Sequence, residues 1–212
     1  MCYKGIIFDM DGVIVDTNLL HYKAWSIVAN KLGLNTYTYE DNEKERGAGR
    51  REGVKRLMHL AGKDLTEKEI DDMEELKNEV FFENLEKVKK EEIVFNDVEY
   101  TLKELDKKGI KKVLGSSSKN GVLLMKKLGL EKYFISIVDG SMVDKAKPDP
   151  EIFKRCMEEL KLKNNEVLIV EDSMNGIEAG NKIGIDCCGK NICSKEVKYT
   201  IKNLRDILDI VG

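Results

Sequence analysis

The chain has 212 residues, of which 42% are hydrophobic and 35% are charged, and its formal net charge is −3. These proportions are ordinary for a soluble globular protein, and the length allows one large domain or a core domain with a smaller insert. The sequence pI of about 5.7 argues against nucleic acid as a partner. No apolar segment approaches the ~20 residues that span a bilayer, and the first residues lack the layout of a signal peptide. We therefore expect a cytoplasmic, monomeric protein that acts on a small molecule, without nucleic-acid or membrane partners.

The five cysteines fit a reducing compartment better than a disulfide framework. Cys187, Cys188 and Cys193 lie within seven residues of one another, which raises the question of a metal site. However, no CxxC spacing is present, and neither His21 nor His59 is close in sequence. We interpret the cysteines as structural thiols.

Residues 5–17 read GIIFDMDGVIVDT and begin with a short apolar run that is typical of a buried strand. Asp9 and Asp11 follow this run two residues apart, so in an extended segment both side chains project to the same face. Gly12 then allows a sharp turn or the close approach of a ligand. The two carboxylates fit a metal site, a nucleophile with a partner acid/base, or a solvated turn.

The next part of the chain, residues 17–92, has the pattern of helices with few strand signals. Thr66 and Glu69 have the spacing of a capping box. The expected helices are 18–32, 41–47, 51–61 and 66–90.

From residue 93 onward, strand and helix patterns alternate, which predicts right-handed crossovers and a mainly parallel sheet covered on both faces. The expected strands are 111–115, 135–138, 167–171 and 185–188. The expected helices are 98–107, 119–128, 150–160, 174–183 and 204–210. The strand before Asp9 must join this sheet because it cannot bury itself alone. We thus predict an α/β core from residues 1–16 and 93–212, interrupted by a helical cap domain of residues 17–92.

In an open parallel sheet, ligands bind outside the carboxyl ends of the strands. Residues 116–120 (SSSKN), Lys147 and the pair Glu171-Asp172 each follow a predicted strand. Each has a simpler interpretation: a turn with a helix cap, a surface lysine, and an N-cap in which Asp172 caps the helix at Met174. As a site, Ser116 would offer its hydroxyl and backbone N–H to an anion at a helix N-terminus. Carboxylates gathered there would repel unless a hard divalent cation such as Mg²⁺ joined them.

The stretch DMDGVIVDT at residues 9–17 resembles the first motif of the haloacid dehalogenase superfamily of phosphatases and phosphomutases. Ser116, Lys147 and the acidic pair resemble its later motifs, in order and at plausible spacing. The resemblance implies a Rossmann-like core in which Asp9 is the nucleophile that forms an aspartyl-phosphate and Asp11 is its general acid/base. It also implies that Ser116 binds the transferring phosphoryl group and that Lys147 offsets its charge. Cations are needed because a carboxylate and a phosphoryl oxygen repel by about 4 kcal/mol at 4 Å in a medium of dielectric 20. The implied Mg²⁺ ligands are Asp9, Asp11, Glu171 and Asp172.

Residues 3–188 also resemble the β-phosphoglucomutase family, through residues 17–25, 47–51 and 116–121. This resemblance implies that Arg50 grips a distal phosphate and that the 116–120 loop surrounds the sugar and its phosphates. The substrate-binding residues that it implies are His21, Trp25, Gly47, Arg50, Lys77, Ser116, Ser117, Ser118, Lys119 and Asn120. The sequence departs from the family at Phe95-Asn96-Asp97, where a Pro-Gly turn is usual, at Gly53, where a polar residue is usual, and at Gly49.

The resemblance implies an isomerase that interconverts β-glucose 1-phosphate and glucose 6-phosphate through an aspartyl-phosphate and a glucose 1,6-bisphosphate intermediate. The alternative is a sugar-phosphate phosphatase built from the same core and cap, in which water accepts the phosphoryl group from Asp9. A non-catalytic phosphate-binding module is a third interpretation, which the presence of both Asp9 and Asp11 disfavours.

Overall fold

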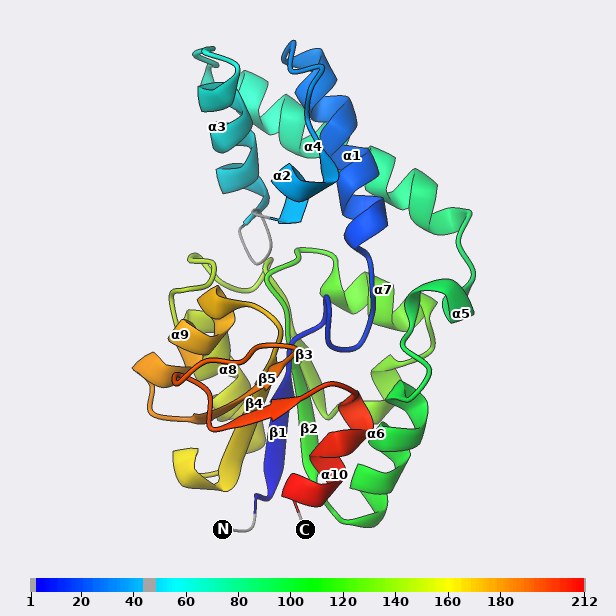
Figure 1. Cartoon of the computed structure of the whole chain (residues 1–212), viewed down its shortest axis with the longest axis vertical. Helices are drawn as coiled ribbons and strands as arrows, with labels where there is room; N and C mark the ends of the chain where they lie inside the picture. Colours follow the sequence, from blue (N-terminus) through cyan, green and yellow to red (C-terminus); the bar gives the residue numbers. More distant parts are fainter. Residues whose placement is uncertain (1–2, 44–48, 212) are drawn as a thin grey trace. The chain divides into compact units, whose positions relative to one another are not determined.

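A computed structural model describes residues 3–43 and 49–211. The chain divides into two compact units, one formed by Met1–Asp16 with Val94–Gly212 and the other by Thr17–Ile93. The first is an α/β unit and the second is a helical unit, and each is described by itself (Figure 1).

The α/β unit is built on one parallel sheet in the order β3-β2-β1-β4-β5-β6, which confirms the predicted α/β class. The strands are β1 (Gly5–Phe8), β2 (Lys111–Gly115), β3 (Ser136–Val138), β4 (Val167–Glu171), β5 (Asp186–Lys190) and β6 (Tyr199–Ile201). The strand β1, dark blue in Figure 1, lies between β2 and β4 in the middle of the sheet. Strands β1 to β5 were predicted to within two residues of their observed ends. The edge strand β6 was not predicted, because its residues Tyr-Thr-Ile do not form an apolar run like that of residues 135–138.

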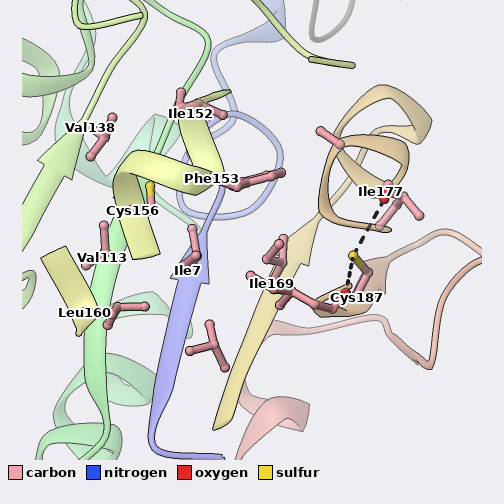
Figure 2. Packing of buried hydrophobic residues seen from close by; sticks show 13 residues of the cluster. Ile7, Val113, Val138, Ile152, Phe153, Cys156, Leu160, Ile169, Ile177 and Cys187 are labelled. Carbon is pink, nitrogen blue, oxygen red and sulfur yellow. Dashed lines mark hydrogen bonds between the residues drawn. The ribbon is translucent and has the colours of Figure 1, made fainter. Parts of the chain in front are cut away.

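Helices connect the strands and cover both faces of the sheet. They are α6 (Val98–Lys107), α7 (Gly121–Lys127), α8 (Glu151–Leu160), α9 (Met174–Lys182) and α10 (Ile207–Ile210), with 3₁₀ turns at Glu131–Tyr133, Asn164–Glu166 and Leu204–Asp206. On one face, α8 and α9 pack against a row of buried strand residues (Figure 2). On the other face, Lys112 of β2 donates a hydrogen bond to the Leu102 carbonyl of α6 (3.2 Å).

The register of the strands explains why the buried residues beneath α8 and α9 form a continuous row. Ile7 is paired with Val113 of β2 and with Ile169 of β4, and Ile169 is paired with Cys187 of β5. Paired residues point to the same side of a parallel sheet, so these four side chains form one row beneath the helices, as Figure 2 shows. Complete burial of an isoleucine or valine stabilises a fold by about 1.5–3 kcal/mol, so this row fixes the register and brings the strand ends to one edge.

The helical unit contains α1 (Asn18–Lys31), α2 (Tyr39–Glu43), α3 (Arg50–Leu60), α4 (Glu67–Glu86) and α5 (Lys90–Ile93). The predicted capping box is confirmed, since Thr66 Oγ1 accepts from the Glu69 N–H and the Glu69 carboxylate accepts from the Thr66 N–H. The long predicted helix 66–90 is wrong in its extent, because α4 ends at Glu86 and α5 is separate. None of the helices in the described part of the chain combines the length and apolar character that crossing a bilayer requires.

Candidate active site

The ammonium group of Lys147 joins the ends of three strands. It donates hydrogen bonds to Asp9 Oδ1 (2.5 Å), to Glu171 Oε1 (2.6 Å) and to the backbone carbonyl of Gly115 (3.0 Å). Asp9 follows β1, Gly115 ends β2 and Glu171 ends β4. All of these groups are buried, so the sheet brings motif residues that are far apart in sequence to one site at its carboxyl edge.

An ammonium group has three N–H donors, and these three protein acceptors use all of them. Lys147 therefore offers a nearby phosphate its positive charge, and a direct hydrogen bond would require one of these contacts to break. This refines the predicted role of the lysine.

Glu171 is held in place by donors on both carboxylate oxygens. Its Oε2 accepts from the N–H groups of Asp172 and Ser173 (3.0 Å each) and from Ser173 Oγ (2.9 Å). The backbone of α9 also approaches closely, since a Cβ atom at Gly176 would lie 1.9 Å from the Glu171 carboxyl carbon. Ser173 caps α9 by accepting from the Gly176 N–H (3.2 Å). The interpretation of Asp172 as the cap is therefore wrong, because the shorter serine side chain occupies that position.

Three carboxylates form a candidate cation site. Asp9, Glu171 and Asp172 each offer an oxygen, and these oxygens lie within 4.8 Å of one another. The Asp11 carboxylate does not belong to this group of described residues, so its role as a ligand stays a prediction. An all-oxygen anionic donor set suits a hard divalent cation, so the residues fit a metal of that kind.

The charges at this site are not balanced by Lys147 alone. Burial raises the pKa of the Asp9 carboxyl well above its usual value of 3.8; Lys147 opposes the shift, and the carboxylates of Glu171, Asp172 and Asp11 add to it. Burial alone would lower the pKa of Lys147, but Asp9 and Glu171 raise it, and the net shift is upward. Lys147 therefore stays protonated, and the surplus negative charge favours binding of a further cation.

The loop after β2 carries the predicted serines. Ser116 is buried, and its Oγ accepts from the Ser118 N–H (3.1 Å). The Ser116 N–H donates to the Val138 carbonyl (3.0 Å), so the prediction that it serves an anion is wrong, because the group continues the sheet pairing. Ser117 Oγ is buried and has no hydrogen-bond partner within the described part of the chain.

Asp139, which sequence reasoning missed, shapes this loop from the end of β3. Its carboxylate accepts from the N–H of Val122 (3.1 Å) and from the N–H and Oγ of Ser141 (2.9 and 2.6 Å). Asp139 thus accepts a hydrogen bond at the start of α7, where the side chain of Asn120 makes no capping hydrogen bond. Lys119 is exposed in the same loop.

Lys77 is the centre of a second polar cluster, within the helical unit. The side chain is only 4% exposed, and its Nζ lies 2.8 Å from His21 Nδ1, 5.4 Å from the centre of the Trp25 ring and 4.8 Å from that of Phe81. With Lys77 protonated, Nδ1 must be the acceptor, so the neutral imidazole carries its proton on Nε2. The ammonium therefore lies beside the rings of Trp25 and Phe81 and contacts His21. The His21 and Phe81 rings also contact each other, with 4.7 Å between their centres.

Arg50 is the first residue of α3, and its Nη2 donates to Asn78 Oδ1 of α4 (2.9 Å). Asn78, next to Lys77, was missed because its contact with Arg50 spans 28 residues of sequence. Burial lowers the pKa of Arg50, while Glu74 opposes the shift; the guanidinium remains charged because its pKa starts far above neutrality. Gly47, also predicted to bind substrate, lies outside the described residues.

Comparison with known proteins defines the class. The family model of haloacid dehalogenase-like hydrolases matches residues 6–190, which run from the second residue of β1 to the end of β5 and include every motif residue above. The chain belongs to the haloacid dehalogenase-like hydrolase family, which confirms the resemblance found in the sequence.

The relatives include both a sugar-phosphate phosphatase and a phosphomutase. The chain is 36% identical over 186 residues to the phosphorylated carbohydrates phosphatase of Thermotoga maritima, covering 86% of this chain and 82% of the relative. It is 29% identical over 188 residues to the β-phosphoglucomutase of Bacillus subtilis, covering 88% and 82%. The crystal structure of β-phosphoglucomutase from Clostridium difficile matches with a TM-score of 0.89 at 28% identity, covering 97% of this chain and 93% of that one.

Proposed function

We propose that the protein transfers phosphoryl groups on sugar phosphates through Asp9, as a β-phosphoglucomutase. The reaction would interconvert β-glucose 1-phosphate and glucose 6-phosphate by way of glucose 1,6-bisphosphate. A mutase has to bind a bisphosphate with either phosphate at the nucleophile, so it needs a second anion-binding cluster. The observation that carries the proposal is that neighbouring residues of α4 in the helical unit each hold a polar contact with another helix: Lys77 contacts His21 of α1, and Asn78 accepts a hydrogen bond from Arg50 of α3.

At the α/β unit, one carboxylate oxygen of Asp9 attacks phosphorus while the bond from phosphorus to the leaving sugar oxygen breaks. Asp11 would donate a proton to that leaving oxygen. In the other half-reaction, Asp11 would take the proton from the 6-hydroxyl of β-glucose 1-phosphate, whose oxygen attacks the phosphorus of the aspartyl-phosphate; the bond from phosphorus to Asp9 breaks, which frees Asp9 and forms glucose 1,6-bisphosphate. Lys147 offsets charge at Asp9. The Ser116 hydroxyl and the Ser117 hydroxyl, for which the described residues provide no hydrogen-bond partner, lie on the loop proposed to surround the substrate. Asp9, Glu171 and Asp172 would hold Mg²⁺, which would supply further positive charge opposite the phosphate.

A sugar-phosphate phosphatase is the second candidate, and the 36% identity to the Thermotoga maritima phosphatase favours it. The two candidates share the attack by Asp9 and differ in the group that accepts the phosphoryl: a sugar hydroxyl in the mutase and water in the phosphatase. The two candidate activities therefore have to be distinguished by the products that the protein forms.

The deciding experiment supplies Mg²⁺, β-glucose 1-phosphate and a trace of glucose 1,6-bisphosphate, and measures glucose 6-phosphate and free phosphate in parallel. Rapid glucose 6-phosphate with little free phosphate supports the mutase, whereas a predominance of free phosphate supports the phosphatase. Asp11→Asn should slow either reaction by about 10²–10⁴-fold, the usual contribution of general acid–base catalysis. Undiminished turnover by this variant would exclude the acid/base role.

A further inference from the structure

Lys190, the last residue of β5, is a second buried lysine at the catalytic edge of the sheet. Its side chain is 5% exposed, and no sequence motif or step of the proposed reaction uses it. The neighbouring strand β4 ends in Glu171, which is paired with Gly189, so Lys190 lies one residue beyond the level of Glu171.

The Lys190 ammonium donates a hydrogen bond to the Gly12 carbonyl (2.7 Å), in the turn that directly follows Asp11. It also lies 3.5 Å from the centre of the Phe95 ring, within the range of a close cation–π contact. Gly12 belongs to the segment that leaves the sheet after β1, and Phe95 belongs to the segment that returns to the α/β unit.

These two segments are joined to each other around the same point. Val15 and Val94 form an antiparallel bridge, and the Phe95 N–H donates to the Ile14 carbonyl (3.3 Å). The returning segment is also where Phe95-Asn96-Asp97 replaces the usual Pro-Gly turn of the mutase family. Here the ring of Phe95 gives the returning chain a direct contact with Lys190.

Burying an ammonium group is unfavourable unless it gains hydrogen bonds or other electrostatic contacts. An apolar side chain of the same length would fill this space without that cost. The lysine therefore provides something that packing alone does not: a donor fixed on the Gly12 carbonyl and a positive charge beside the loop of Asp9 and Asp11.

We propose that Lys190 is a positioning residue for phosphoryl transfer: it holds the turn at Gly12, and through it Asp9 and Asp11, while Phe95 fixes the ammonium from the returning segment. The proposal rests on the proposed phosphoryl chemistry at Asp9 and is independent of which sugar is the substrate. Lys190 acts through the backbone of the catalytic loop and is not itself a catalytic residue.

Lys112 provides a matched control. It is also a buried lysine of the same sheet, it also donates to a backbone carbonyl, that of Leu102 (3.2 Å), and it forms an ion pair with Asp106. It lies near the start of β2, away from the carboxyl edge. Lys190→Met and Lys112→Met thus remove comparable buried charges, of which one touches the catalytic loop.

The test uses the full chain with Mg²⁺ and p-nitrophenyl phosphate, and measures kcat, KM and the thermal unfolding midpoint. Lys190→Met should lower kcat by about 10²-fold, the typical effect of misplacing reacting groups by an ångström, and should change KM by less than about threefold. Lys190→Arg, which keeps the charge and donors, should restore most of the loss. Lys112→Met should lower the unfolding midpoint and leave kcat within about twofold of the unaltered protein.

If Lys190→Met does not fold, Phe95→Leu serves instead, because it removes the ring and leaves the lysine; we expect it to lower kcat by about tenfold at constant KM. The proposal is overturned if the Lys190 variants keep their kcat, or if Lys190→Met and Lys112→Met lose kcat equally. Absence of activity in the unaltered protein toward both p-nitrophenyl phosphate and the glucose phosphates would overturn the proposed function instead.

Discussion

The carboxyl of Asp9 faces one ammonium and several carboxylates in a buried setting. Its pKa is raised by burial and by those neighbours, despite Lys147, so the folded protein holds the Asp9 proton more tightly than the unfolded chain does. Without metal, the stability due to this group is therefore greatest below the unfolded-state pKa and declines as the pH rises toward the folded-state pKa.

This sign gives a prediction for Asp9→Asn, which stays neutral at every pH. In EDTA, the variant should unfold at a higher temperature than the unaltered protein at pH 7, and the difference should shrink below about pH 4, where aspartate is protonated in both states. Scanning calorimetry from about pH 3 to about pH 8 measures this difference. Mg²⁺ should stabilise the unaltered protein more than the variant; equal stabilisation of both would contradict the assignment of Asp9 as a ligand.

Arg50 and Arg51 are adjacent in sequence and have different surroundings. Arg50 donates to the neutral amide of Asn78, whereas Arg51 forms ion pairs with Glu67, Asp71 and Glu74. If Arg50 binds the distal phosphate, Arg50→Met should raise the KM for glucose 1,6-bisphosphate by about 10–10²-fold, as expected for loss of a hydrogen bond to a charged group.

Arg51→Met is the control for that prediction. Because its guanidinium is engaged by three acids of α4, we expect its loss to lower stability slightly and to leave the KM for the bisphosphate unchanged. Steady-state kinetics of both variants decides the matter. Similar KM values for the two would show that Arg50 does not contact the phosphate.

At the scale of the element, helix α3 has a glycine in its interior, Gly53, because a larger residue there would clash with Trp25. A Cβ atom at Gly53 would lie 2.6 and 2.7 Å from the Cζ2 and Cη2 atoms of Trp25, whose side chain is buried. An interior glycine costs a helix about 1 kcal/mol relative to alanine, so this position gives up helix propensity for close contact between α3 and the indole of α1. That indole lies against Lys77.

Gly53→Ala should therefore destabilise the protein by about 1–3 kcal/mol, because overpacking outweighs the gain in helix propensity. Urea unfolding measures this free energy. In a double-mutant cycle, Trp25→Phe removes the ring edge that would clash, so Gly53→Ala should cost less in that background. A stabilising effect of Gly53→Ala alone would refute the contact.

The residues that sequence reasoning found are those whose role is tied to their place after a strand. Asp9, Lys147 and Glu171 meet because parallel strands end at one edge, and that edge follows from the strand pattern. Lys190 and Asn78 were missed because their partners are remote in sequence and chosen by packing. A pattern that predicts which residues lie on a face does not predict which of them touch.

The helices and strands show the same difference between features that follow from a sequence pattern and features that depend on packing. The helices that follow a clear 3.6-residue repeat were found, and their ends shifted by a few residues where caps decide them, as at α7, which starts at Gly121 where 119 was predicted. The use of the Ser116 N–H in the sheet depends on the edge strand β3, which has only three residues. Short edges and local caps are thus the parts of this fold that composition and periodicity determine least.

At the scale of the molecule, the two compact units have separate cores. The buried cluster over the sheet draws all its residues from the α/β unit, and the cluster around Val28 and Leu57 draws all its residues from the helical unit. Val15 and Val94 are bridged where the chain leaves and re-enters the α/β unit, so a short link can join these ends.

We therefore expect a chain in which residues 17–93 are replaced by a four-residue Gly-Ser linker to fold cooperatively and to gain thermal stability from Mg²⁺. Circular dichroism melts with and without the metal measure both properties. The intact chain is the control for the size of the metal effect. A non-cooperative melt would show that the α/β unit depends on the helical unit for its folding.

The central position of β1 has a further consequence, for the nascent chain. This strand precedes its neighbours in synthesis, yet its partner β2 begins more than 100 residues later, at Lys111, and its other partner β4 begins at Val167. Until both have left the ribosome, the apolar residues Ile6, Ile7 and Phe8 lack the pairing that buries them. Contacts of such long sequence separation form slowly and leave unpaired strand edges exposed. The helical unit, which lies between β1 and β2 in the sequence, is fully synthesised before the strand that precedes Asp9 has found either neighbour.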